Sequence, residues 1–159
     1  MVIKGGSFFM KLRGMTSKME DYVVFDKLSY YTGYSISIDE ISECRTEINP
    51  IDPPLKYEEY CTVLENDYKD YFLLENDDGK GIGIVTIIDE GDCIKIDEMI
   101  VDREYQLKGI GRIFFQLIES KAKTEGKEEI ILTCYFPGAM IFWEKMGFKQ
   151  EGIVFVKKL

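Results

Sequence analysis

The chain contains no histidine, and this absence limits the chemistry that it can perform. Histidine is the commonest metal ligand and the commonest general base, so any proton transfer must use carboxylates, tyrosines, lysines, cysteines or water. Cysteine is scarce as well. Its four residues form no CxxC pair, which favours reduced, buried thiols over disulfides or a metal cluster. We therefore expect no metal centre.

Long apolar runs and an excess of positive charge are also missing. The longest apolar runs, such as residues 82–88, are far shorter than the roughly 18 residues of a membrane span, and the run at residues 7–10 is too short for a signal core. The net charge of −9 disfavours nucleic acid as a partner, because nucleic-acid binding needs a basic surface. We expect a soluble, cytoplasmic protein that binds neither membrane nor nucleic acid and whose charge favours cationic small molecules or basic peptides.

The pattern of apolar residues is typical of one α+β domain over residues 1–159. Helical spacing predicts helices over 17–31, 57–65, 110–123 and 139–147. Strands are predicted over 7–13, 71–75, 79–90, 93–101, 128–135 and, as a final pair or one bent strand, 148–159. Three of the four prolines fall within residues 48–54 and interrupt regular structure there. The order predicts a mixed, mostly antiparallel central sheet flanked by helices.

The tetrapeptide KGIG occurs twice, at residues 80–83 and 108–111. Such glycines cradle an anion where a strand ends and a helix begins, because the first N–H groups of the helix are unpaired and its dipole lies behind them. The first copy follows a turn and continues as a strand, which favours a structural role. The second opens a helix without a Ser, Thr, Asp or Asn cap. A bound anion could replace that cap, assisted by Gln106, Lys108 and Arg112, although glycine is itself an acceptable N-cap.

Two standard nucleotide motifs are absent from the sequence. A dinucleotide fingerprint needs a third glycine three residues after the second. That position holds Thr86 after the first KGIG and Phe114 after the second. A Walker loop needs Ser or Thr after Gly-Lys, and neither the pair at 79–80 nor the pair at 126–127 has one. These residues disfavour a nicotinamide or flavin enzyme and a P-loop nucleotidase.

Two motifs carry a resemblance to a known family. Residues 106–111, QLKGIG, follow the pattern of Gln or Arg, two residues, Gly, one residue, and Gly or Ala, between a strand and a helix. Residues 142–148, FWEKMGF, are similar to an aliphatic-Tyr-Glu-Lys-x-Gly-Phe run on the next helix. In this order the motifs resemble the GCN5-related N-acetyltransferase (GNAT) superfamily. The resemblance implies a GNAT-like fold with a cofactor-binding core at about 70–155 and an acceptor side at about 16–66.

The resemblance also implies an acyltransferase that moves an acetyl group from acetyl-coenzyme A to a primary amine of a small molecule or peptide. The pyrophosphate would lie on the N–H groups of the glycine loop, and the pantetheine arm would extend the sheet edge. The implied cofactor-binding residues are Met99, Ile100, Val101, Gln106, Leu107, Lys108, Gly109, Ile110, Gly111 and Arg112.

The reaction needs a base, because an amine with a pKa near 10 is protonated at neutral pH. Asp97 and Glu98 lie on the strand where some members of the superfamily carry such a carboxylate. Strict alternation along this strand places them on opposite faces, so only one reaches the substrate unless a β-bulge re-aims the chain. Asp97 lies four residues before Val101, and this spacing favours it as the base. The alternative for both Asp97 and Glu98 is a solvated carboxylate without a catalytic role.

The tyrosine that protonates the departing thiolate in similar proteins is Trp143 here, and an indole is no practical acid. Tyr135 is a candidate substitute, although thiolate is also a fair leaving group because the pKa of a thiol is near 8.5. The asparagine of many members is Phe136. These two departures favour the second hypothesis, a coenzyme A or acyl-coenzyme A binding module with little catalysis.

The acceptor is expected to enter beside the early helices and the proline-containing segment, and a homodimer is a possible assembly. The candidate residues for binding a cationic amine there are Tyr30, Tyr31, Tyr34, Glu40, Glu43 and Glu47.

Overall fold

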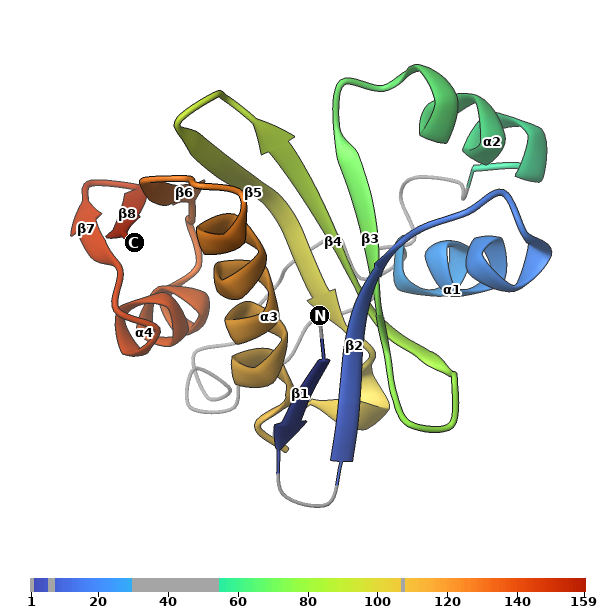
Figure 1. The fold of residues 1–159 in the computed structure, drawn as a ribbon, viewed down its shortest axis with the longest axis horizontal. Coiled ribbons are helices and arrows are strands. Elements are labelled where there is room, and N and C mark those ends of the chain that lie inside the picture. Colours follow the sequence, from blue (N-terminus) through green and yellow to red (C-terminus); the bar gives the residue numbers. More distant parts are fainter. Residues whose placement is uncertain (1, 6–7, 30–54, 107) are drawn as a thin grey trace.

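The computed structural model describes residues 2–5, 8–29, 55–106 and 108–159. Within these residues the strands form one eight-stranded sheet in the order β1-β2-β3-β4-β5-β6-β8-β7, with helices on both faces (Figure 1). Strands β5 and β6 pair in parallel and the other neighbours are antiparallel. The predicted α+β fold with a mixed, mostly antiparallel sheet is confirmed.

The predicted helices and strands are all present, and the structure adds a short first strand that was not predicted. The strands are β1 (Val2–Gly5), β2 (Phe8–Gly14), β3 (Asp70–Glu75), β4 (Gly81–Asp89), β5 (Cys93–Val101), β6 (Glu129–Thr133), β7 (Lys149–Glu151) and β8 (Val154–Lys158). The helices are α1 (Met19–Ser29), α2 (Tyr57–Asn66), α3 (Ile110–Thr124) and α4 (Pro137–Lys145), with a 3₁₀ turn, η2 (Arg103–Tyr105). None of the helices in the described part of the chain has the length and apolar character of a membrane span.

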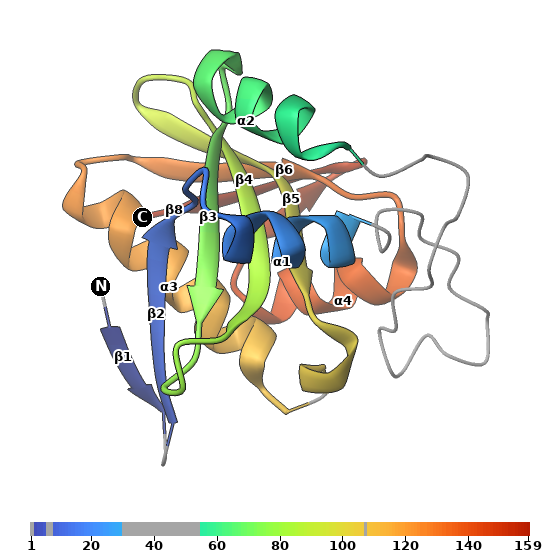
Figure 2. The same cartoon turned by 90° about the vertical axis from the view of Figure 1, so that its right-hand side faces the viewer.

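The sheet separates two apolar clusters. Figure 2 shows α1 in front of β3 and β4, with α3 and α4 behind the sheet. On the α3 side, Phe114, Leu117 and Ile118 recur at helical spacing and pack against β4, β5 and β6. On the α1 side, Leu28 and Ile100 belong to a smaller buried cluster. The side chains of β5 therefore pack against both helical layers.

Strand β5 contains a β-bulge at Asp97. Thr86 of β4 pairs with Glu98, whereas the next residue, Ile87, pairs with Ile96. Asp97 is the extra residue between them, and such an insertion reverses the alternation of side chains beyond it. Accordingly Ile96 packs on the α3 side and Ile100 on the α1 side. The prediction of strict alternation through the strand is therefore wrong beyond residue 96.

A buried carboxylate joins α1 to β2. The Arg13 guanidinium donates to both oxygens of Asp21 at 2.7 and 2.9 Å, and the backbone N–H and hydroxyl of Thr16 donate to Asp21 Oδ2 at 2.8 and 2.9 Å. Burial acts to raise the pKa of Asp21, but these hydrogen bonds outweigh burial, so the pKa lies below its usual value. The charged form of Asp21 thus stabilises the fold.

We expect Asp21→Asn to lower the free energy of unfolding by about 2 kcal/mol at neutral pH, since it removes a charged acceptor from a partly exposed arginine. Because the folded pKa of Asp21 is depressed, this contribution is present above the usual carboxyl pKa and is lost as the pH falls below about 4. Urea unfolding at neutral pH and near pH 3 measures both values. The exposed Asp77→Asn is the control, and an equal loss in both variants would contradict the assignment.

Candidate active site

Strands β5 and β6 stop pairing halfway along β5. Their parallel register ends with Ile96 opposite Leu132, whereas β5 continues to Val101. Among the described residues, no strand covers this edge from Met99 to Val101. Backbone N–H and C=O groups on an uncovered edge can bond an extended ligand as another strand would.

A hollow of about 320 Å³ opens beside this uncovered edge. Met99 and Val101 supply one wall, and the beginning of α3 supplies another with Arg112. The hollow is also lined by Gln106, Gly109, Gly111, Ala139, Phe142, Trp143, Lys145 and Met146. These side chains include two cations and no carboxylate, so the hollow suits an elongated ligand that has an apolar arm and an anionic group.

Within the described residues, the first turn of α3 has no side chain that caps its N–H groups. Gly109 is its N-cap, with a φ of +77° and no side-chain cap. A Cβ at this position would meet nothing within 4 Å, so the left-handed backbone, rather than crowding, is what favours glycine. The free N–H groups of the first turn and the helix dipole attract negative charge. The second KGIG thus has the geometry that the sequence predicted for it.

The first KGIG is packed tightly against the core. A Cβ on Gly83 would lie 2.9 Å from the carbonyl oxygen of Ile100 and 2.9 Å from the ring of Phe114. One on Gly81 would lie 3.0 Å from both Leu73 and Val24. These glycines allow close packing, as the sequence indicated.

The turn between β5 and the glycine loop is held by side chains. Gln106 Nε2 donates to the carbonyl oxygen of Val101 at 2.8 Å. Asp102 is buried; its Oδ2 accepts from Lys27 of α1 at 2.7 Å, and its Oδ1 accepts from the backbone N–H of Glu104 at 3.2 Å. These bonds fix the end of β5 relative to α1.

The remaining candidate cofactor residues differ in position. Ile100 faces the α1 side and Ile110 is buried in the α3 core, so neither side chain lines the hollow. Lys108 is exposed, with Nζ 5.8 Å from the centre of the Tyr105 ring. Leu107 lies outside the described residues.

The three candidate catalytic residues meet in a second hollow of about 100 Å³, between β5 and the end of β6. Asp97, Glu98 and Tyr135 all line it. Trp143 lines both this hollow and the larger one. The two hollows therefore lie on either side of this indole.

The two carboxylates have different surroundings. Asp97 Oδ2 accepts from Lys69 Nζ at 2.9 Å. Glu98 has no ion pair or hydrogen bond within the described part of the chain, and it lies across from Thr86, which in turn lies across from Tyr71. Glu98 is exposed as a residue, but the protein groups around its carboxylate displace water and raise its pKa, the charge of Asp97 raises the pKa further, and the charge of Lys69 opposes both effects.

Tyr135 and Trp143 differ in exposure. Tyr135 is 64% exposed. Trp143 is buried and packs edge-to-face on the rings of Phe115, Phe142 and Phe148. Trp143 therefore acts as a wall of both hollows.

Sequence reasoning missed Cys134 and Lys69. Cys134 lines the smaller hollow beside the catalytic candidates, where burial raises the pKa of its thiol. Lys69 is separated from Asp97 by 28 positions in the chain, and no local pattern could have indicated that pairing.

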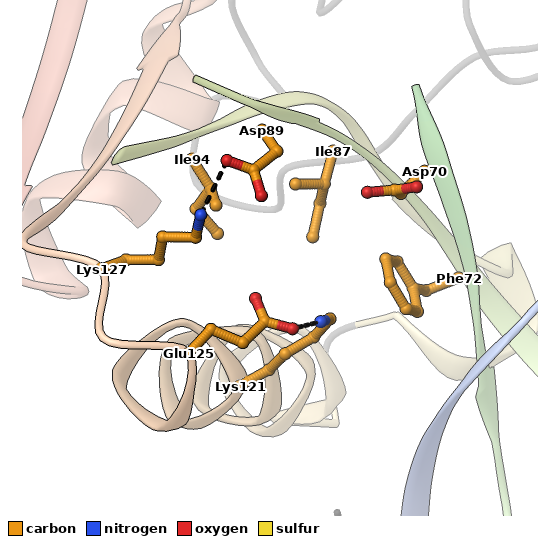
Figure 3. Close-up of a pocket in the computed structure, with 8 residues that line it drawn as sticks. All are labelled: Asp70, Phe72, Ile87, Asp89, Ile94, Lys121, Glu125 and Lys127. Atoms are coloured by element: carbon orange, nitrogen blue, oxygen red, sulfur yellow. Dashed lines mark hydrogen bonds and ion pairs between the residues drawn. The ribbon is translucent and has the colours of Figure 1, made fainter. Parts of the chain in front are cut away.

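Another hollow, of about 170 Å³, lies at the far end of α3 (Figure 3). Its charged side chains neutralise one another, because Lys127 bonds Asp89 at 2.7 Å and Lys121 bonds Glu125. Phe72 and two isoleucines line the rest of its wall with Asp70. Since four of its five charged groups are paired with each other, it offers less to a ligand than the hollows beside β5.

The acceptor-side candidates Tyr30, Tyr31, Tyr34, Glu40, Glu43 and Glu47 lie outside the described residues. In the ranges that the structure describes, no group of three or more His, Cys, Asp or Glu side chains could hold a metal ion.

Comparison with known proteins was made by sequence and by structure. The model of the Acetyltransferase (GNAT) family matches residues 37–148. A search of curated proteins found no match.

Solved structures with the same fold are numerous, and three illustrate the range. The ribosomal-protein-S18-alanine N-acetyltransferase from Escherichia coli is 12% identical, with 94% of this chain and 93% of that chain covered and a TM-score of 0.65. The PaiA N-acetyltransferase from Thermoplasma acidophilum in complex with coenzyme A is 16% identical, with coverage of 94% and 99% and a TM-score of 0.63. The spermidine/spermine N-acetyltransferase SpeG from Vibrio cholerae in complex with manganese ions is 16% identical, with coverage of 94% and 92% and a TM-score of 0.68.

The packing around the first KGIG leads to a stability prediction. We expect Gly83→Ala to lower the free energy of unfolding by about 2 kcal/mol, since the new methyl group would press on the β5 backbone. Gly14→Ala is the matched control, because a Cβ at Gly14 in β2 would meet nothing within 4 Å. Urea unfolding of both variants measures the difference, and a Gly83→Ala protein as stable as the control would contradict the packing argument.

Proposed function

The chain belongs to the acetyltransferase (GNAT) family, and on this premise we propose that it transfers an acetyl group from acetyl-coenzyme A to a primary amine of a small molecule or peptide. The observation that carries the proposal is the uncovered edge of β5, which has an anion-attracting helix start at one end and a pair of carboxylates at the other. A donor and an amine could therefore meet along one strand.

The donor would lie in the larger hollow. The N–H groups of the α3 first turn and the Arg112 guanidinium would hold its pyrophosphate, and the β5 edge from Met99 to Val101 would bond its amide-containing arm. The apolar walls fit an alkyl chain. When bound, acetyl-coenzyme A supplies a thioester that an amine can attack without an added energy source.

Glu98 is the better candidate for the base. Its carboxylate has no bound cation within the described residues, whereas Asp97 is occupied by Lys69. The raised pKa of Glu98 makes it a stronger proton acceptor than an ordinary carboxylate. We assign proton removal from the acceptor ammonium to Glu98, directly or through water, and electrostatic support to Asp97.

Protonation of the departing thiolate needs no dedicated residue. Trp143 excludes water from the junction of the hollows, and thiolate is a fair leaving group because the pKa of a thiol is near 8.5. Tyr135, an exposed residue that lines the smaller hollow, is a protein group that could supply the proton.

The acceptor is a cationic amine. The carboxylates around the smaller hollow and the net charge of −9 favour such a molecule. Proteins of the same fold include a spermidine/spermine N-acetyltransferase and a ribosomal-protein-S18-alanine N-acetyltransferase, so polyamines and peptide N-termini are the first amines to test.

A coenzyme A binding module with little catalysis is the second candidate function. It is favoured by Trp143 and Phe136 at positions where similar proteins carry tyrosine and asparagine. Coenzyme A binding without thiol release for any amine would favour this module.

Acceptor-dependent release of thiol from acetyl-coenzyme A is the direct test of catalysis. We expect turnover with at least one amine of a panel of polyamines, amino acids and peptides.

Glu98→Gln should lower kcat/KM on the order of a hundredfold, because general-base catalysis contributes that much or more. The rate of the wild type should rise with pH through the raised pKa of Glu98, and this limb should disappear in the variant. Glu151→Gln, an exposed change on β7, is the control, and equal rates in both variants would remove Glu98 from the mechanism.

Coenzyme A binding tests the glycine loop. A Cβ at Gly111 would lie 3.3 Å from the Phe142 ring and narrow the hollow, so Gly111→Val should weaken binding about tenfold or more while the protein stays folded. Trp143 is the single tryptophan of the chain and lines this hollow, so its fluorescence reports binding, with calorimetry as an independent measurement. Gly14→Val, on β2, is the matched control. Unchanged affinity in Gly111→Val would contradict the placement of the donor.

A further inference from the structure

Among the residues that the structure describes, Lys69 is the lysine that bonds a catalytic candidate. Its Nζ donates to Asp97 Oδ2 at 2.9 Å and lies 5.6 Å from the centre of the Tyr68 ring. A carboxylate and an aromatic face are the groups that bind an ammonium ion in proteins. Lys69 is therefore held in the way that a cationic acceptor would be held.

The surroundings of Lys69 include the group to which we assign proton removal. Glu98 follows Asp97 directly at the bulge, and the charge of Lys69 opposes the rise in the pKa of Glu98. Burial and the hydrogen bond to Asp67 raise the pKa of Tyr71, two residues beyond Lys69, and the charges of Glu98 and Asp97 add to this rise. Lys69 Nζ is bonded to Asp97, and Asp97 lines the smaller hollow together with Glu98, so the ammonium and the two carboxylates form one cluster beside that hollow.

This cluster contains a primary amine, a cation-binding carboxylate and a base, which are the components that the proposed function requires on the acceptor side. Met99, one residue beyond Glu98, begins the strand edge along which the donor would lie. We propose that Lys69 is a self-acetylation site, modified by the chain's own acetyltransferase centre when no external amine is present. The inference rests on the proposed function and deepens it.

The step balances without a further reagent. The ammonium of Lys69, whose Nζ is bonded to Asp97, loses one proton to Glu98 through an intervening water, and Glu98 passes that proton to bulk water. The free Nζ then attacks the acetyl carbonyl carbon, a nitrogen–carbon bond forms, and the carbon–sulfur bond breaks. The second proton of the nitrogen ends on the departing thiolate. One acetyl-lysine, one coenzyme A thiol and one released proton result.

Acetylation would change the acceptor side electrostatically. The Lys69 ammonium is lost, and with it the ion pair that occupies Asp97. Both carboxylates would then face a cationic acceptor, so the modified protein should bind such an amine more tightly than the unmodified one.

The different exposure of two lysine side chains distinguishes self-acetylation from non-enzymatic acetylation by acetyl-coenzyme A. Both lysines are ion-paired, but Lys69 is 25% exposed, whereas Lys158 is 81% exposed. A non-enzymatic reaction would favour Lys158, because it depends on access to a free amine. A reaction directed by the site would favour Lys69.

The experiment incubates the purified full chain with acetyl-coenzyme A alone and maps acetylated lysines by peptide mass spectrometry over time. We expect Lys69 to be modified at least about tenfold faster than Lys158, at a rate per molecule that does not change on dilution. Glu98→Gln should lower modification of Lys69 on the order of a hundredfold and leave Lys158 unchanged. Lys69→Arg keeps a cation beside Asp97 and should show no acetylation in that peptide.

Each outcome decides a separate point. Thiol release with the amine panel but an unmodified Lys69 overturns self-acetylation and leaves the proposed function standing. Coenzyme A binding with neither thiol release nor Lys69 modification overturns both. If Lys69 is modified no faster than Lys158, or at an unchanged rate in Glu98→Gln, the reaction is non-enzymatic acetylation and the proposal is overturned.

Discussion

The candidate site depends on the point at which the two parallel strands stop pairing. Beyond Ile96 and Leu132, β5 and β6 no longer share hydrogen bonds, and the edge of β5 is left as a binding surface. Helix α3 begins where β5 has ended, so its unpaired N–H groups lie at the end of that same edge. If the strands paired to their ends, the sheet would be complete and neither hollow would exist.

The bulge at Asp97 is the second constraint, because it lies one residue past the last paired position. The bulge reverses which face of the sheet the following side chains point to, so that Ile96 packs on the α3 side and Ile100 packs on the α1 side. It also brings two consecutive carboxylates to one hollow, which a regular strand would direct to opposite faces. Because like charges and loss of water raise the pKa of Glu98, the backbone irregularity also determines the chemistry of the side chain.

Local patterns in the sequence predicted the elements well but not their irregularities. The bounds of β5 follow from its apolar residues and the turns beside it, and the role of Gly109 follows from its place between a strand and an uncapped helix. The bulge could not be predicted, because it is a property of register against β4, and strict alternation gave the wrong face for Ile100. Strand β1 was not predicted because it has only four residues, which is too few to show a strand pattern. Lys69 was missed because a contact across 28 positions exists only after the sheet has formed.

The ion pair between Lys27 and Asp102 joins the part of the chain proposed to bind the acceptor to the part proposed to bind the donor. Lys27 belongs to helix α1, which we propose to lie on the acceptor side, and Asp102 supports the turn before the glycine loop. Leu28, next to Lys27, belongs to the same buried cluster as Ile100 of β5. A fragment that began at β3 would keep the residues assigned to the donor and lose these supports for their positions. Transfer of the donor-binding segment to another scaffold would therefore require α1 to be transferred with it.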